Sequence, residues 1–201
     1  MHKLALLLFI GISACMLSCK KETHAKVQTV TVRDTVYVEV RDTTIIPAMI
    51  SDTTTTFIVL RHAEKESTGT DPNLNSDGVL RADELKRILG NVPVKAIYST
   101  PFNRTLQTVQ PLAAEKSITV EEYQTSKPYS ELVSEISAAN RGKVVVVVGH
   151  SNTVPDFLKE LSKNTFSVSI SESQYDNLFI VSLHDKLSPK ITALKYGKAT
   201  P

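Results

Sequence analysis

A run of five consecutive valines, at residues 144–148, constrains the fold of this chain more than any other feature. Valine favours strands, and a strand with one face in water would alternate apolar and polar residues. A continuous apolar run is instead typical of a strand buried on both faces, as in a parallel sheet covered by helices. The run therefore predicts an α/β fold.

Short apolar segments alternate with helical segments from residue 56 onward. Strands are predicted at residues 56–60, 94–99, 118–120, 144–148, 177–183 and 190–195. A first helix is predicted from a Ser76 cap to about residue 89, with Gly90 as its stop. A second opens at Thr100 and Pro101 and runs to about residue 114. Two more helices are predicted at residues 129–139 and about 154–161. We therefore expect a three-layer α/β/α fold, in which a mostly parallel sheet has helices on both faces.

Composition excludes several classes of function. The net charge of the 201-residue chain is only +2 at pH 7, and tryptophan is absent. A nearly neutral chain without a basic stripe and interleaved aromatics is a poor candidate for nucleic-acid binding. Both cysteines, Cys15 and Cys19, lie within the first twenty residues. We therefore expect the folded part to use no disulfide, no cysteine nucleophile and no Cys-bound zinc.

The N-terminus is similar to an export signal. An apolar run over residues 4–12 follows His2 and Lys3, and it is shorter than the roughly 20 residues that span a bilayer. The small residues and cysteines that follow resemble the bacterial lipoprotein signal, in which a lipidated cysteine becomes the mature N-terminus. We place the lipid on Cys19, with Cys15 as the alternative. Residues 1–19 are thus predicted to be a signal peptide of an exported protein, anchored by lipid to a bacterial membrane and facing the periplasm or the cell surface.

Residues 20–55 differ in composition from the rest of the chain. They are rich in Thr, Val and Asp, and the sequence Val-Arg-Asp-Thr occurs at residues 32–35 and again at 40–43. Alternating valines over residues 30–40 are compatible with a local strand or hairpin, although an isolated strand pair is marginal in water. We interpret this segment as a tether between the lipid and a domain at residues 56–201. Its alternation could instead pair with the sheet edge of a partner.

Polar residues follow three of the predicted strands. Arg61 and His62 follow the first, Arg104 lies early in the helix after the second, and His150 follows the valine run. Ligands of open parallel sheets bind at the carboxyl ends of the strands, so we expect these four side chains to share one site. Each residue alone would be unremarkable, and their convergence is what indicates a site.

Two histidines and two arginines in one site match the chemistry of phosphoryl transfer. Guanidinium groups bind phosphoryl oxygens with paired donors, and a neutral imidazole is a nucleophile toward phosphorus. Nearby arginine charges disfavour the protonated ring, so we expect His62 to stay neutral near neutral pH. His150 could donate a hydrogen bond to the transferring group, and backbone amides near Ser151 and Asn152 could add donors.

The same segments resemble the motifs of a known family. Residues 57–65, Phe-Ile-Val-Leu-Arg-His-Ala-Glu-Lys, resemble the Arg-His-Gly signature of the histidine phosphatase (phosphoglycerate mutase-like) superfamily, with Ala63 in place of the commoner Gly. Residues 98–108 and 148–153 are similar to the segments that hold the family's second phosphate-binding arginine and second histidine. The intervals between the motifs are short, as in the small phosphatases of the superfamily.

The resemblance implies roles for these residues. His62 would accept the phosphoryl group as a phosphohistidine that water later cleaves, and Arg61, Arg104 and His150 would form the phosphate pocket. The family needs no metal and no organic cofactor, which agrees with the lack of a ligand motif such as His-Glu-x-x-His in the sequence.

The family also uses a general acid, which protonates the leaving oxygen. In many members this acid is a carboxylate on the segment after the third strand. Glu122 is our choice in this chain, and Glu121 and Glu64 are its rivals. A solvated acidic pair is the ordinary interpretation of Glu121 and Glu122. One branch of the superfamily has its acid directly after the second histidine, where this chain has Ser151.

The sequence therefore predicts a metal-independent phosphatase that hydrolyses phosphate monoesters. Its substrate would be a phosphorylated small molecule or a surface component, and not a nucleic acid. Two alternatives remain open. One is a non-catalytic surface lipoprotein that binds an anion or phosphate with the same fold. The other is a phosphohistidine phosphatase acting on signalling proteins, which the export signal disfavours.

Overall fold

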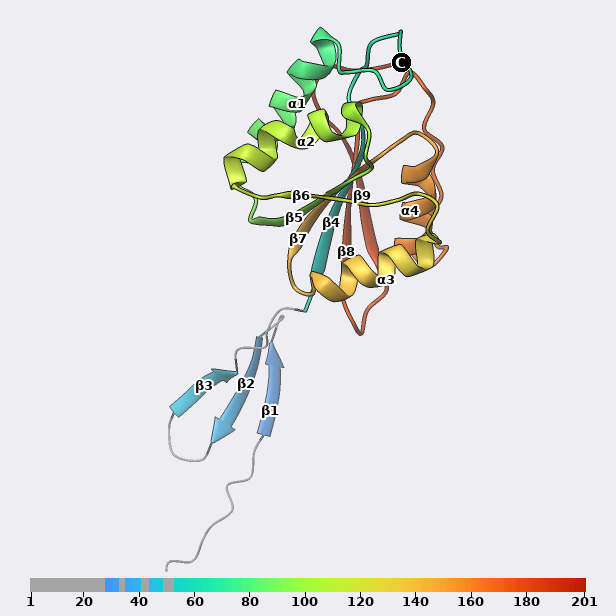
Figure 1. Ribbon diagram of the computed structural model, residues 1–201. Coiled ribbons are helices and arrows are strands. Elements are labelled where there is room, and N and C mark those ends of the chain that lie inside the picture. Colours follow the sequence, from blue (N-terminus) through green and yellow to red (C-terminus); the bar gives the residue numbers. More distant parts are fainter. Residues whose placement is uncertain (1–27, 33–34, 41–43, 49–52) are drawn as a thin grey trace, which may run out of the picture. The chain divides into compact units, whose positions relative to one another are not determined.

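The computed structural model describes residues 28–32, 35–40, 44–48 and 53–201 (Figure 1). The chain divides into two compact units, Met1–Ile50 and Ser51–Pro201. The predicted signal peptide, with Cys15 and Cys19, lies outside the described residues. Within the described ranges, no helix combines the length and the apolar character that crossing a membrane requires.

The first unit contains a small antiparallel sheet in the segment that the sequence presents as a tether. Its strands are β1 (Gln28–Val32), β2 (Thr35–Val40) and β3 (Thr44–Ala48), in the order β1-β2-β3. Val30 pairs with Tyr37, and Val38 pairs with Ile46. The local strand pairing that the alternating valines allowed is thus present, whereas the tether role stays a prediction.

The second unit is built on a sheet of six strands in the order β6-β5-β7-β4-β8-β9. Its strands are β4 (Thr55–Arg61), β5 (Val94–Ser99), β6 (Val120–Glu122), β7 (Val144–Gly149), β8 (Asn177–Leu183) and β9 (Lys190–Lys195). Its helices are α1 (Ser76–Leu89), α2 (Asn103–Lys116), α3 (Tyr129–Ala139) and α4 (Thr153–Leu161). Helices α1 and α2 lie on one face of the sheet, and α3 and α4 on the other (Figure 1).

The direction of the strands makes the sheet mixed. β4 runs parallel to β7, and β5 runs parallel to both β6 and β7. β8 pairs antiparallel with β4, and β9 pairs antiparallel with β8. The structure therefore confirms the predicted three-layer α/β/α fold, with two antiparallel strands completing a parallel core.

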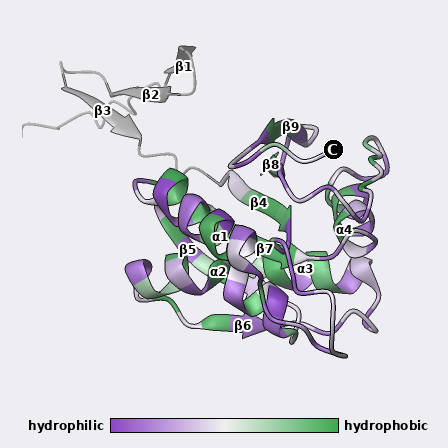
Figure 2. Ribbon diagram, turned by 90° about the horizontal axis from the view of Figure 1, so that it is seen from above, coloured by the Kyte–Doolittle hydropathy of each residue, from purple (hydrophilic) through white to green (hydrophobic). Residues whose placement is uncertain are grey.

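Both faces of the central strands are buried, which accounts for the unbroken valine run. Val145 and Val147 belong to one hydrophobic cluster, which includes residues of α3 and α4. Val146 and Val148 belong to the other, with residues of α1 and α2. Hydrophobic residues accordingly concentrate along the strands of the sheet (Figure 2). Each face of the sheet is therefore covered by its own pair of helices, and polar residues lie at the ends of the strands.

Three predicted boundaries are wrong, each for a local reason. The cap of α1 is Asn75, not Ser76, because the Asn75 side chain accepts a hydrogen bond from the Gly78 amide at 2.9 Å. Helix α2 begins at Asn103, and so Pro101 precedes it. Strand β6 begins only at Val120, since α2 continues to Lys116 and ends at a left-handed Ser117 (φ 54°).

The late start of α2 has a functional cause. Phe102 is extended (φ −113°, ψ 143°) at the N-cap, and the Thr105 hydroxyl donates to the carbonyls of Thr100 and Phe102. The Thr100 hydroxyl contacts His150 Nε2 at 2.9 Å. Residues 100–102 therefore form a turn that contributes to the site and not the first turn of the helix.

Candidate active site

Strand pairing brings the two histidines together. Arg61 at the end of β4 is in register with Gly149 at the end of β7, and the His62 amide donates to the Gly149 carbonyl at 3.0 Å. The residues that follow, His62 and His150, have ring centroids 5.4 Å apart at an interplanar angle of 65°. The predicted convergence at the carboxyl ends of parallel strands is thus a direct result of the β4–β7 register.

The hydrogen bonding of His62 leaves one ring nitrogen available. Nδ1 lies 2.8 Å from the carbonyl oxygen of Ala63. A carbonyl oxygen can only accept, so Nδ1 carries the proton and Nε2 holds the lone pair. The Ala63 amide in turn donates to Thr108 Oγ1 at 2.9 Å, which anchors this turn to α2. The ring is therefore held in the tautomer that a nucleophile requires.

His62 is neutral across the physiological range. Its pKa is lowered to about 3, chiefly by burial and to a smaller extent by Arg61, His150 and Arg104, whereas the hydrogen bond to Ala63 raises it. The side chain is only 2% exposed. The neutral state expected from the sequence is present, but desolvation, and not arginine charge, is its largest cause.

His150 is held from two sides. Its Nε2 lies 2.9 Å from Thr100 Oγ1, whose own hydroxyl proton is donated to Thr105 Oγ1. Nε2 therefore carries the ring proton, and Nδ1, which lies 3.4 Å from Arg104 Nη2, accepts. Burial, followed by the charges of Arg104 and Arg61, lowers the pKa of His150 to about 4.

Arg61 is buried beside the histidines at 1% exposure. Its Nη1 donates to the carbonyls of Ser171 (2.8 Å) and Gln174 (3.2 Å), and its Nη2 donates to Glu172 Oε2 at 2.7 Å. The guanidinium lies 4.3 Å from the ring centroid of Tyr175. The segment before β8, residues 171–175, therefore holds this arginine through hydrogen bonds, an ion pair and a contact with an aromatic ring.

Arg104 occupies the first turn of α2 and faces the same site. Its Nη1 lies 3.4 Å from Asp71 Oδ1, and its guanidinium lies 4.5 Å from the ring centroid of Phe102. Asp71 also accepts hydrogen bonds from the Asn103 amide at 3.0 and 3.2 Å. The Asp71 carboxylate thus both accepts from the first amide of α2 and orients Arg104.

Both arginines hold an unused donor. Within the described part of the chain, Nε of Arg61 and Nε of Arg104 are buried without a hydrogen-bond partner. A buried donor without an acceptor costs roughly 1–3 kcal/mol. Two such donors beside two neutral imidazoles form an environment that an oxyanion would satisfy.

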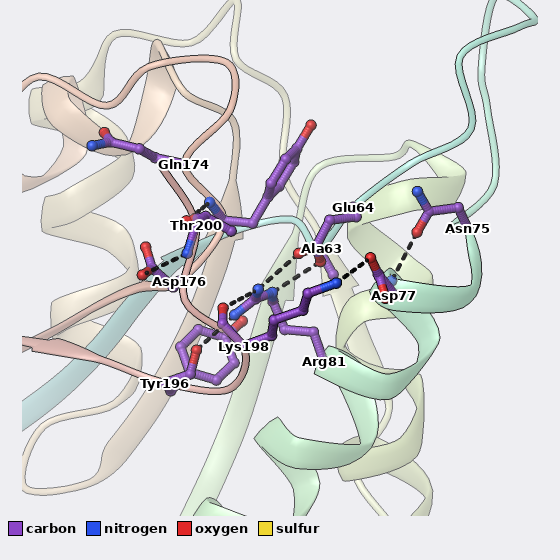
Figure 3. Close-up of polar contacts among 12 residues, drawn as sticks. Ala63, Glu64, Asn75, Asp77, Arg81, Gln174, Asp176, Tyr196, Lys198 and Thr200 are labelled. Atoms are coloured by element: carbon purple, nitrogen blue, oxygen red, sulfur yellow. Dashed lines mark hydrogen bonds and ion pairs between the residues drawn. The ribbon is translucent and has the colours of Figure 1, made fainter.

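The carboxylates predicted as acids lie elsewhere. Glu122 is exposed at the end of β6 and, with Glu121, lines a separate pocket of about 390 Å³. No hydrogen bond or ion pair joins either residue to the two histidines within residues 53–201. Glu64 accepts from Arg81 Nε (2.9 Å) and Nη2 (2.7 Å), so both of its oxygens are committed to that arginine (Figure 3).

The sequence did not point to several residues that border the site. Side chains that contact its arginines and histidines without having been predicted include Asp71, Thr100, Phe102, Glu172 and Tyr175. Thr100 and Phe102 belong to a segment already matched to the family motif, so adjacency could have found them. Glu172 and Tyr175 stand in a polar loop more than 100 positions from Arg61, with no spacing signal. The described residues contain no group of three or more His, Cys, Asp or Glu that could hold a metal ion.

Residues 57–125 match the family model of the histidine phosphatase superfamily (branch 1). This stretch contains Arg61, His62 and Arg104, whereas His150 lies beyond it. A search of curated proteins found no match for the chain.

Solved structures share the fold at low sequence identity. The protein histidine phosphatase SixA complexed with tungstate is 14% identical, with a TM-score of 0.59 over 70% of this chain and 96% of its own. A mycobacterial glucosyl-3-phosphoglycerate phosphatase is 13% identical, with a TM-score of 0.57 over 72% of this chain and all of its own. A phosphoserine phosphatase from Entamoeba histolytica is 17% identical, with a TM-score of 0.54 over 72% and 98%. Residues 57–125 thus resemble this superfamily in sequence, and the chain shares the fold of these solved phosphatases.

Proposed function

We propose that the protein is a phosphatase that hydrolyses phosphate monoesters through a phosphohistidine on His62. The observation that carries this proposal is the state of the His62 ring. Its Nδ1–H is tied to the Ala63 carbonyl, so the Nε2 lone pair is free beside two arginines with unused donors. The names of the structural neighbours, which are phosphatases, support the same reaction class.

In the proposed reaction the arginines hold the phosphoryl group. Arg61 and Arg104 donate to its outer oxygens, since planar guanidinium groups match them in pairs. His62 Nε2 attacks phosphorus, the ester P–O bond breaks, and the leaving oxygen takes a proton from an acid. Water then attacks phosphorus, the P–N bond breaks, and inorganic phosphate leaves.

His150 would change its protonation state during the reaction. In the free protein its Nδ1 accepts, and burial keeps its pKa at about 4. A bound phosphate dianion would raise that pKa, because an opposite charge nearby favours the imidazolium. Nδ1–H could then donate to the phosphoryl group and stabilise the charge that develops in transfer.

We expect the alanine variant His62→Ala of the full chain to lose at least about a thousandfold in turnover of 4-nitrophenyl phosphate, because the nucleophile is gone. The assay contains EDTA, since the proposal includes independence of metal. His184→Ala is the control and should keep its activity, because this half-buried histidine directly follows the end of β8 that lies away from His62. Turnover of the His62 variant at the wild-type rate would contradict the proposal.

A second candidate is a non-catalytic protein that binds phosphate with the same residues. It is favoured by the exposed position of Glu122, which leaves the predicted acid away from the histidines. It predicts binding of inorganic phosphate that depends on Arg61 and Arg104, with no turnover by the wild-type chain. Export and lipid attachment at Cys19 or Cys15 stay predictions, and they would place either activity outside the cytoplasm.

A further inference from the structure

The reaction proposed above needs a proton donor, and the contacts around Arg61 identify a candidate. Phosphoryl transfer to His62 expels an oxyanion, which is a poor leaving group unless it is protonated as it departs. Within residues 53–201, two carboxylates contact the phosphate-binding arginines, namely Glu172 on Arg61 and Asp71 on Arg104. We therefore compare these two carboxylates as candidates for the general acid.

Asp71 is held by contacts that the protein itself supplies. Both of its oxygens accept from the Asn103 amide, at the N-terminal end of α2, where the helix dipole favours negative charge. Arg104 adds a further positive charge at 3.4 Å. The contacts with the Asn103 amide belong to the end of α2 and do not depend on a substrate, so Asp71 stays on the helix when a phosphate binds Arg104.

Glu172 has partners that a substrate would replace. Its Oε2 accepts from Arg61 Nη2 at 2.7 Å, and its Oε1 accepts from the Ser151 hydroxyl, next to His150. Its side chain is nonetheless 79% exposed, whereas that of Arg61 is 1% exposed. The carboxylate thus lies between solvent and the buried arginine, on the path that a phosphate would take to Arg61.

We propose that Glu172 is the general acid of the reaction, displaced from Arg61 by the incoming phosphoryl group and left beside the leaving oxygen. This inference rests on the proposed phosphatase function. It assigns the role to Glu172 in place of Glu122.

The charge balance at Glu172 changes when the phosphate binds. In the free protein the hydrogen bond from Ser151, and then the charge of Arg61, hold the pKa of Glu172 below its usual range, although partial burial opposes them. The other titratable groups that face it are Lys65 and His150. A bound dianion takes over Arg61 and adds a like charge nearby, and both changes raise the pKa of the carboxyl. Glu172 then takes one proton from water.

The proton balance closes over the two steps. In the first, the P–Nε2 bond forms, the ester P–O bond breaks, and the Glu172 proton moves to the leaving oxygen. In the second, the Glu172 carboxylate accepts a proton from the attacking water while the P–N bond breaks. The phosphate group leaves, Glu172 releases this proton to solvent, and its carboxylate can return to Arg61.

The test compares two substrates of nearly the same shape, phenyl phosphate and 4-nitrophenyl phosphate, in the full chain. Nitrophenolate leaves readily without a proton, whereas phenolate depends more on the acid. We expect Glu172→Gln to lower kcat/KM for phenyl phosphate at least about tenfold more than for 4-nitrophenyl phosphate. The matched variants Glu122→Gln and Asp71→Asn should affect both substrates by the same factor.

Equal losses on both substrates in Glu172→Gln would overturn the assignment, because they would indicate that Glu172 only positions Arg61. A selective loss in Glu122→Gln or Asp71→Asn would overturn it in favour of that residue. A wild-type chain that turns over neither ester would overturn the phosphatase function and this proposal together. The two failures are therefore distinguishable.

Discussion

At the scale of single residues, Arg81 connects the site to distant parts of the chain. It is 2% exposed, and its donors reach Glu64, two positions after His62, and the carbonyls of Tyr196 and Lys198, both at 2.6 Å (Figure 3). Thr200, in the same C-terminal segment, accepts from the Tyr175 amide at 3.1 Å. Arg81 thus joins the turn after His62 to the C-terminal segment, and that segment in turn holds the loop that contains Tyr175.

Arg81→Lys should lower the free energy of unfolding by about 3 kcal/mol, because an ammonium cannot replace the four directed hydrogen bonds that the buried guanidinium makes to Glu64 and to two carbonyls. Urea unfolding measures the change. Arg87→Lys on the exposed side of the same helix, where Arg87 pairs with Glu84, is the control and should change stability little. Equal effects in both variants would contradict this account of Arg81.

At the scale of elements, the contact between α1 and the turn after His62 depends on Gly78. A Cβ atom at this position would lie 2.0 Å from the backbone oxygen of Glu64. The helix can therefore lie against the turn only because the side chain is absent there.

Gly78→Ala should destabilise the protein by about 2 kcal/mol, although alanine normally stabilises a helix interior relative to glycine. Thermal unfolding followed by circular dichroism measures it. Gly90→Ala is the matched control, since Gly90 ends the same helix in right-handed geometry and its nearest obstacle is the flexible Glu115 side chain at 3.2 Å. The explanation fails if the two variants melt alike.

Predictability also differs from element to element. The bounds of α3, β5, β8 and β9 follow from apolar periodicity and turn residues, because local packing decides them. The start of α2 does not, since the Thr100 hydroxyl serves His150 and the Thr105 hydroxyl closes the preceding turn. The antiparallel direction of β8 and β9 likewise depends on which edge of the sheet remains free, and no local pattern encodes that.

The site itself divides in the same way. The sequence alone predicted that four side chains share one site, because each comes after a strand and the carboxyl ends of parallel strands lie at one edge of the sheet. These residues are Arg61, His62, Arg104 and His150. Glu172 and Tyr175 could not, since their position depends on the path of a loop that returns to Arg61 from a distant part of the sequence. Carboxylates on exposed loops are common, and only the 2.7 Å contact distinguishes this one.

At the scale of the whole molecule, two neutral histidines, the buried His62 and the half-buried His150, make stability depend on pH. The pKa values of His62 and His150 are about 3 and about 4 when folded, against an ordinary value of 6.5. Below pH 6.5 the unfolded chain binds protons that the folded chain does not, so acid favours unfolding.

We expect the free energy of unfolding of the full chain to be constant above about pH 7 and to fall by a few kcal/mol between pH 6.5 and 4. Urea unfolding in phosphate-free buffer at several pH values measures this. His62→Gln should show a shallower fall, and His184→Ala should follow the wild type. A His62→Gln profile as steep as that of the wild type would assign the acid sensitivity to other groups.

The central position of β4 has a consequence for how the chain folds. β4 precedes every other strand of its sheet in the sequence, yet Val59 pairs with Val147 of β7 and Phe179 of β8. Contacts between such distant residues are slow to form, and an apolar strand that waits for its partners is prone to aggregate. β4, which His62 directly follows, therefore has no partner in its sheet until β7 and β8 have been made. With this topology, residues 55–61 have to be kept from aggregating until the later strands are available.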